Sequence, residues 1–283
     1  MREVLVVASR TLGGGKLFDA LRARANEDPA RPVRFRLVVP ASDPSAGLVI
    51  YDESVRESAQ VRVDLALEAL AGEGLEATGE VGDADPFSAT MDAVGASRPD
   101  EIIVSTHPAQ SSGWLRRDLI ERIRNATGLP VEHVVVDIAG EGLPFKATLV
   151  IANKTSSGDE LISHLKDMAA DGERHLFIAV VPQADGSGPA PREARARLAS
   201  MLDRLRDAGL LGSGMIGDPD PYTAAINALE LFTVDNVVIS TLPGERSGWL
   251  RSNLIERVQS ASGVPVQHVV VDTQATATAA PVS

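Results

Sequence analysis

Short apolar runs alternate with longer amphipathic segments through the first half of the chain. The short runs, most of them rich in valine or isoleucine, have the length and composition of buried strands. They cover residues 4–8, 33–40, 75–81, 101–105 and 131–137. The segments between them place apolar residues at helical spacing, at 17–25, 55–70, 86–94 and 113–126. Strands that alternate with helices predict right-handed crossovers and a parallel sheet with helices on both faces.

The second half of the chain repeats the first. SSGWLRRDLIERIRNATGLPVEHVVVD at 111–137 returns as RSGWLRSNLIERVQSASGVPVQHVVVD at 246–272, an offset of 246 − 111 = 135. GDADPFSATMDAV and DEIIVSTHP return at the same offset as GDPDPYTAAINAL and DNVVISTLP. VLVVASRT at 4–11 returns as TLVIANKT at 148–155, where the offset is 148 − 4 = 144. The smaller offset later in the chain indicates that the first copy carries an insertion, which we place at ASDPSAGLVIYDES.

The length of 283 residues suits two domains of about 140 residues each. Between the two copies, AGEGLPFKA interrupts the alternating pattern with two glycines and a proline. We therefore predict two doubly wound α/β domains with five parallel strands each, at residues 1–140 and 141–283.

Composition and charge exclude several classes of protein. The chain has no cysteine, so disulfides, thiol catalysis and cysteine metal sites are absent. The formal net charge is −12 and no long basic run occurs, which argues against a nucleic-acid surface. No apolar run approaches the roughly 20 residues that a membrane span needs. The first ten residues favour a strand over a signal peptide, so we expect a cytoplasmic protein without nucleic-acid or membrane partners.

Each repeat resembles the universal stress protein family. The resemblance rests on the apolar opening strand, the Gly-Asp turn after the third strand, and the final helix and strand that read ERI…GLPVEHVVV. It covers essentially the whole chain, once per repeat. It implies a tandem member whose halves pack as an internal pseudo-dimer, since the last strand of that family commonly pairs two subunits. It also implies a role in a stress response or in regulation.

Both repeats depart from the pattern of the family members that bind ATP. Those members carry an aspartate after the first strand and a G-x2-G-x9-G-[ST] loop after the fourth. Here the first strand is followed by Ala-Ser-Arg or Ala-Asn-Lys, and the fourth by STHPAQSSG or STLPGERSG, without the aspartate or the leading glycines. ATP and AMP stay candidate ligands, but the standard site is not retained.

The residues that replace the standard loops still offer groups that hold phosphate. Hydroxyls, backbone amides before a helix and basic side chains bind phosphate without a glycine-rich loop. In a doubly wound sheet, ligands lie beyond the carboxyl ends of the strands, where the strand order reverses. The candidate binding residues of the first copy are Ser9, Arg10, Gly82, Asp83, Ser105, Thr106, Ser112, Gly113 and Arg116. Those of the second copy are Asn153, Lys154, Gly217, Asp218, Ser240, Thr241, Ser247, Gly248 and Arg251.

Several of these residues, and two repeated pairs beside them, also have a purely structural interpretation. Serines before a helix commonly cap it, so capping is favoured for Ser112 and Ser247. Asp83 and Asp218 precede Asp-Pro segments and favour turn and helix-start chemistry. The paired tryptophans, Trp114 and Trp249, favour packing over adenine stacking. The paired histidines, His133 and His268, favour ordinary strand or interface positions over a titrating pair.

The sequence contains no motif that predicts catalysis. It has no H-x-x-x-H pair and no G-x-S-x-G elbow, and TLGGGK lacks the spacing of a phosphate-binding P-loop. Two functions therefore stay open for a non-enzymatic protein. One is a binding module for a nucleotide or another phosphorylated small molecule. The other is a structural or regulatory interaction protein that has lost nucleotide binding. A nucleotide hydrolase is a weaker third option.

Overall fold

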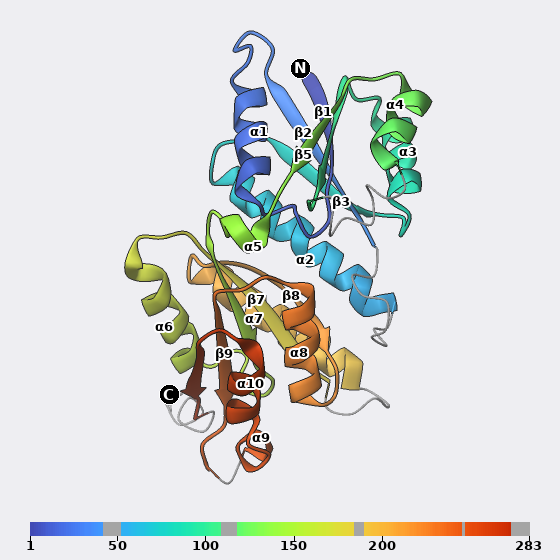
Figure 1. Ribbon diagram of the computed structural model, residues 1–283. Helices are drawn as coiled ribbons and strands as arrows, with labels where there is room; N and C mark the ends of the chain where they lie inside the picture. The colour runs from blue at the N-terminus through green and yellow to red at the C-terminus, as the bar shows by residue number, and fades with distance from the viewer. Residues whose placement is uncertain (42–51, 109–117, 184–189, 245–246, 273–283) are drawn as a thin grey trace. The chain divides into compact units, whose positions relative to one another are not determined.

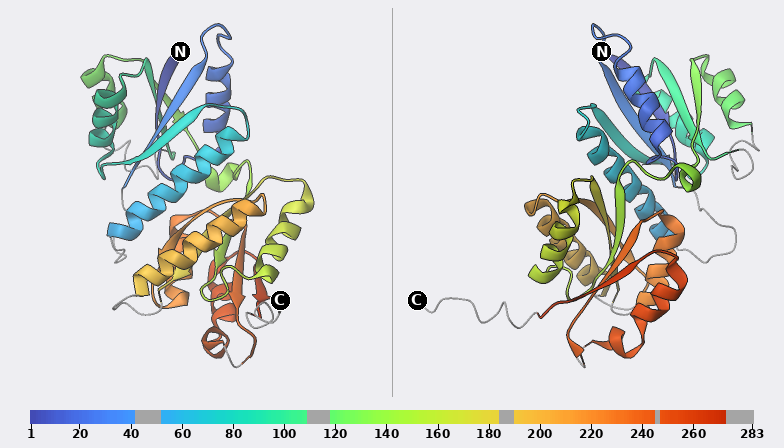
Figure 2. Two further views of the ribbon diagram at one scale, coloured as in Figure 1. Left: turned by 180° about the vertical axis from the view of Figure 1, so that it is seen from behind. Right: turned by 60° about the vertical axis from the view of Figure 1, so that its left-hand side comes forward.

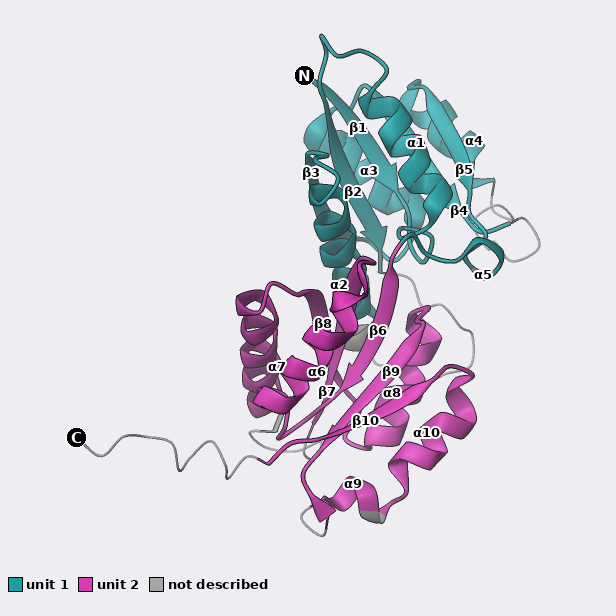
Figure 3. Ribbon diagram, turned by 90° about the vertical axis from the view of Figure 1, so that its left-hand side faces the viewer, with its two compact units in different colours: residues 1–144 teal, residues 145–283 magenta. Residues whose placement is uncertain are grey.

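The structure is a computed structural model that describes residues 1–41, 52–108, 118–183, 190–244 and 247–272 (Figure 1). The chain divides into two compact units, Met1–Pro144 and Phe145–Ser283 (Figure 3). This division lies 144 − 140 = 4 residues after the boundary that we placed from the sequence. The packing of the halves as a pseudo-dimer stays a prediction.

The first unit contains one five-stranded parallel sheet with the strand order β3-β2-β1-β4-β5. Its elements are β1 (Arg2–Val7), α1 (Gly15–Ala25), β2 (Val33–Pro40), α2 (Asp52–Ala71), β3 (Ala77–Gly82), α3 (Pro86–Ser97), β4 (Glu101–Thr106), α4 (Leu119–Thr127), β5 (Val131–Val135) and α5 (Ile138–Glu141). β1 lies in the middle, where Val4 pairs with Phe35 of β2 and with Glu101 of β4. The strand order reverses at this point, as in a doubly wound fold.

The second unit has the same topology, with the strand order β8-β7-β6-β9-β10. Its elements are β6 (Lys146–Ile151), α6 (Asp159–Met168), the short 3-10 helix η2 (Ala169–Asp171), β7 (His175–Pro182), α7 (Ala190–Asp207), β8 (Leu211–Gly217), α8 (Pro221–Leu231), β9 (Asn236–Thr241), α9 (Gly248–Arg251), α10 (Leu254–Ser262) and β10 (Val266–Val270). The predicted fold class, two tandem doubly wound α/β domains with five parallel strands each, is confirmed.

Helices cover both faces of each sheet (Figures 1 and 2). Because strand side chains alternate between the faces, each sheet supplies two apolar layers. One layer in the first unit joins strand residues such as Leu5 and Val104 to Ala89 of α3 and Ile123 of α4. One layer in the second unit joins strand residues such as Val238 to residues of α6 and α7. The central strands are therefore buried on both sides, which leaves the loops at the strand ends to carry function.

The helix that we predicted over 113–126 differs in the structure. Helix α4 begins only at Leu119, because Asp118 lies in the left-handed region at φ 48°. In the second unit the equivalent Asn253, at φ 50°, separates the short α9 from α10. Asparagine and aspartate tolerate this conformation better than most residues, so the helical spacing continues while the backbone turns between two helices.

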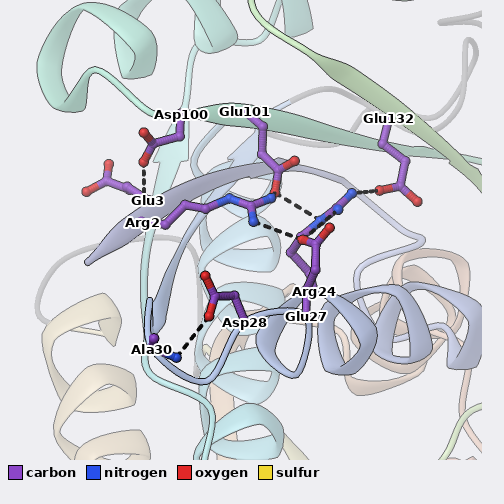
Figure 4. A network of polar contacts seen from close by, with 9 residues as sticks. All are labelled: Arg2, Glu3, Arg24, Glu27, Asp28, Ala30, Asp100, Glu101 and Glu132. Carbon is purple, nitrogen blue, oxygen red and sulfur yellow. Dashed lines mark hydrogen bonds and ion pairs between the residues drawn. The ribbon is translucent and has the colours of Figure 1, made fainter.

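An ion-pair network ties the first unit together near the amino-terminal ends of its strands (Figure 4). Glu101 at the start of β4 is 8% exposed and pairs with Arg2 of β1 at 2.7 Å and with Arg24 of α1 at 3.0 Å. The two arginines also share Glu27, and Arg24 reaches Glu132 of β5. The network therefore links β1, β4, β5 and α1 at the end of the sheet opposite to the carboxyl ends of its strands.

Among the described residues, no helix combines the length and the apolar character that crossing a membrane requires.

Candidate functional site

The second unit contains a pocket of about 210 Å³ at the carboxyl ends of β6 and β9. It is lined by Asn153, Lys154, Thr155, Ser240, Thr241, Leu242, Ser247, Gly248 and Trp249. These residues belong to the loop after β6, the end of β9 and the start of α9. Because β6 and β9 are parallel neighbours, with Ile151 opposite Ile239, both strands deliver their loops to the same edge of the sheet. This is the point at which the strand order reverses, where doubly wound folds bind ligands.

The loop after β6 is held against β9 by a hydrogen bond and by one close approach. The Thr155 hydroxyl donates to the carbonyl of Ser240 at 3.1 Å. A Cβ on Gly158 would lie 2.2 Å from Cγ1 of Val271, so only glycine lets the loop lie this close to the end of β10. These two contacts fix the position of Asn153 and Lys154 beside Ser240.

The first unit holds its own loop in the same way. The Thr11 hydroxyl donates to the carbonyl of Ser105 at 3.2 Å, and a Cβ on Gly14 would lie 2.1 Å from Cγ1 of Val136. Both copies therefore keep the same framework around the carboxyl ends of their central strands. The sequence offered a signal for it, because the threonine and the glycine recur at the offset of 144.

Ser247 has the capping role that the sequence favoured. Its hydroxyl accepts from the backbone N–H of Leu250 at 3.3 Å at the start of α9. The side chain is buried at 5% exposure, and Gly244 before it has a φ of 46°. Ser247 shapes the wall of the pocket while its oxygen is already engaged.

Thr241 of the pocket wall contacts a histidine, and the same threonine–histidine pair recurs in the first unit. Thr241 Oγ1 lies 2.8 Å from Nε2 of His268 in β10, and Thr106 Oγ1 lies 2.8 Å from Nε2 of His133 in β5. Burial lowers the pKa of both histidines. Sequence reasoning missed this pair, although both members recur at the offset of 135.

Two buried polar atoms of residues that line the pocket have no hydrogen-bond partner among the described residues. They are Oγ of Ser240, whose residue is 1% exposed, and Oδ1 of Asn153. Buried polar atoms almost always have partners, because leaving one unpaired costs about 1–3 kcal/mol. The Ser105 hydroxyl of the first unit is in the same situation. Both Ser240 and Asn153 line the pocket, so a bound ligand is the candidate partner for these atoms, and Lys154 adds an exposed ammonium group to the same lining.

The structure brings together most of the candidates of the second copy. The six that line the pocket are Asn153, Lys154, Ser240, Thr241, Ser247 and Gly248. Trp249, for which packing was favoured, is half-buried and lines the same pocket. The backbone of Arg251 belongs to α9, but its side chain lies outside the described part of the structure.

Gly217 and Asp218 are not part of the pocket lining, and the structure gives each of them a structural contact. A Cβ on Gly217 would lie 2.7 Å from Cβ of Ala224, so this glycine lets α8 pack closely on the sheet. The carboxylate of Asp218 accepts from the backbone N–H of Asp220 at 2.8 Å, and Asp220 caps α8. These contacts are turn and helix-start chemistry.

The first unit repeats this arrangement. A Cβ on Gly82 would lie 2.7 Å from Cβ of Ala89 in α3. The carboxylate of Asp83 accepts from the backbone N–H of Asp85, which caps α3. For Asp83 and Asp218, the structure supports the turn and helix-start interpretation.

The described candidates of the first unit lie at the equivalent strand ends. Ser105 and Thr106 are buried at the end of β4, and Arg10 is exposed after β1 beside Ser9. Burial, and secondarily the charge of Arg10, lowers the pKa of His107, which stands where the second unit has Leu242. Ser112, Gly113, Trp114 and Arg116 lie outside the described residues.

The geometry offers no resident metal centre in the part of the chain that the structure describes. Within those ranges, no group of three or more histidine, aspartate or glutamate side chains could hold a metal ion.

Comparisons with known proteins add little to this geometry. No family model matches the chain, and no curated protein matches it. A solved universal stress protein from Archaeoglobus fulgidus DSM 4304 is similar over 95% of this chain and 96% of its own, at 16% identity and a TM-score of 0.34. A histidinol dehydrogenase from Elizabethkingia anophelis is similar over 96% of this chain and 53% of its own, at 13% identity and a TM-score of 0.27. Both TM-scores are too low to support a function.

Proposed function

We propose that the second unit binds a phosphorylated small molecule in the pocket at the carboxyl ends of β6 and β9, with an adenine nucleotide as the first candidate. The observation that carries this proposal is the buried hydroxyl of Ser240, which has no partner among the described residues and belongs to the same pocket lining as the ammonium group of Lys154. A hydroxyl and an ammonium group donate hydrogen bonds to phosphate oxygens, and the bond from a charged donor is the stronger.

The walls of the pocket suit the carbon part of such a ligand. Trp249 and Leu242 supply apolar surface next to the polar groups. A volume of about 210 Å³ lies below the roughly 300–1,000 Å³ of pockets that enclose drug-sized ligands. The pocket therefore suits a fragment the size of a phosphate and its attached group, and the rest of a nucleotide would extend outward.

The proposed role is binding, in a regulatory or stress-response setting, rather than catalysis. This part of the proposal rests on the sequence resemblance to universal stress proteins and on the absence of a catalytic motif from the sequence. The cytoplasm as location and a pseudo-dimer of the two halves belong to the same proposal.

A protein-interaction module is the second candidate function. It is favoured by Val135 of β5 and Val270 of β10, which are 39% and 45% exposed at equivalent positions. Both lie on the last strand of their sheet, where an apolar side chain is a natural contact for another protein surface.

Native mass spectrometry and thermal melts with ATP, ADP and AMP test the binding proposal. A ligand at about 100 times its dissociation constant adds about 2.7 kcal/mol, which raises the melting temperature by several degrees. We expect Lys154→Ala and Ser240→Ala to reduce the shift, whereas Lys166→Ala, at an exposed position on α6, leaves it unchanged. Melts that do not move at millimolar nucleotide would contradict the proposal and favour the interaction module.

A further inference from the structure

Most hydroxyl groups that line the pocket of the second unit already form hydrogen bonds within the protein. Thr155 donates to the Ser240 carbonyl, and Thr241 donates to the carbonyl of Leu242 at 3.1 Å while it contacts His268. Ser247 accepts from the backbone of Leu250. Besides the exposed ammonium group of Lys154, the lining offers Ser240 and Asn153, whose buried oxygens have no partner among the described residues.

Ser240 and Asn153 require different groups on the ligand. A hydroxyl such as that of Ser240 both donates and accepts, so a phosphate oxygen satisfies it. The carbonyl oxygen of an asparagine side chain only accepts. A phosphomonoester near neutral pH is mostly a dianion, since its second pKa is about 6, and its oxygens then only accept as well. Phosphate alone therefore leaves Asn153 Oδ1 buried without a partner among the described residues.

We infer that the ligand is a phosphomonoester that carries a hydroxyl group close to its phosphate, and that this hydroxyl donates to Asn153 Oδ1. Sugar phosphates and the ribose phosphate of a nucleotide share this chemistry. The inference rests on the proposed function and makes Asn153 a residue that determines specificity. The volume of about 210 Å³ agrees with a ligand fragment of this size.

A matched pair of ligands tests the inference on the full chain. Glycerol 3-phosphate and n-propyl phosphate have the same phosphate and the same number of carbons, but only the first has free hydroxyls. Isothermal titration should show glycerol 3-phosphate binding about tenfold more tightly, because propyl phosphate leaves the buried acceptor unpaired. This comparison uses the wild-type chain and needs no variant to fold.

The variant Asn153→Ala completes the test. Without the acceptor, the advantage of glycerol 3-phosphate should fall to about twofold or less. Asn26→Ala, at an exposed position after α1, is the control and should keep the full advantage. Ribose 5-phosphate and AMP then distinguish a sugar phosphate from a nucleotide as the ligand. AMP binds more tightly than ribose 5-phosphate only if the base also contacts the protein.

The outcomes separate the two claims. Equal affinity of the wild type for glycerol 3-phosphate and propyl phosphate would overturn the inference and leave the proposed function standing. An advantage that persists unchanged in Asn153→Ala would overturn it as well. If no phosphomonoester binds at all, the proposed function itself fails, and the inference fails with it.

Discussion

The hydroxyl oxygen of Thr241 lies 2.8 Å from Nε2 of His268, and the same distance joins Thr106 to His133. Each threonine also donates its proton to a backbone carbonyl, that of Leu242 or His107. The hydroxyl then accepts from the ring, which places a proton on Nε2, and the lowered pKa of both histidines favours the neutral imidazole. In the second unit this bond ties the last strand to a residue that lines the pocket.

The neutral histidines predict how stability depends on pH. Burial lowers the pKa of His133 and His268 below the usual 6.5, and burial together with Arg10 does the same for His107. Between these lowered pKa values and 6.5, the histidines of the unfolded chain bind more protons than those of the folded chain. The free energy of unfolding that these histidines contribute is therefore fully present above pH 6.5, and it falls as the pH decreases through this window. Urea unfolding at about pH 7.5 and about pH 5.5 measures the loss.

The double variant His133→Gln and His268→Gln provides the control for this prediction. The amide of glutamine still donates to the threonine but does not titrate. We expect the variant to lose less stability on acidification than the wild type, with His107 accounting for part of what remains. The same loss in both proteins would show that these two histidines do not titrate as described.

The approach of Gly158 to Val271 predicts a strong dependence on side-chain size. Gly158→Ala forces a Cβ to within 2.2 Å of a stiff valine methyl group and should cost about 1–3 kcal/mol in urea unfolding. Val271→Ala in the same chain should recover part of this cost. Gly95→Ala is the matched control, since nothing lies within 4 Å of its new Cβ and alanine is the better residue inside α3. A Gly158→Ala chain as stable as the wild type would contradict the observed packing.

The ion-pair network of the first unit predicts a larger effect at Glu101 than at an exposed glutamate. Glu101→Gln weakens the charged hydrogen bond from Arg2, removes the ion pair with Arg24, and should cost about 1–3 kcal/mol in urea unfolding. Glu76→Gln breaks an exposed pair with Arg34 and should cost less than about 1 kcal/mol. Equal effects of the two substitutions would show that the network adds nothing beyond a surface pair.

The sequence predicted the fold well because its signals are local and occur twice. Apolar runs such as EIIVST are buried along their whole length in β4, and the repeat offsets placed equivalent strands in both units. The break at Asn253 was missed because helical spacing continues across it. Its only signal is that both copies place a residue tolerant of positive φ there, Asp118 in the first and Asn253 in the second.

The candidate site was predicted in part for a reason of geometry. The carboxyl ends of all strands in a parallel sheet lie at one edge, so the sequence made both Asp218 after β8 and Lys154 after β6 candidate ligand-binding residues. In the strand order, however, β7 separates β8 from β6, and this places the two strands about 10 Å apart. The roles of Thr155 and Trp249 depend on which side chains face the pocket, and strand periodicity does not extend into the loops that decide it.

The central claim is that the pocket beside Trp249 binds a phosphorylated small molecule, and nuclear magnetic resonance observes this pocket directly. The chain has two tryptophans, so its spectrum contains two indole N–H signals, and Trp249→Phe identifies the one from the pocket. On titration with AMP, we predict that the Trp249 signal shifts until it saturates, and that Lys154→Ala weakens this response. A Trp249 signal that stays in place at millimolar AMP, ADP and ATP would contradict the account.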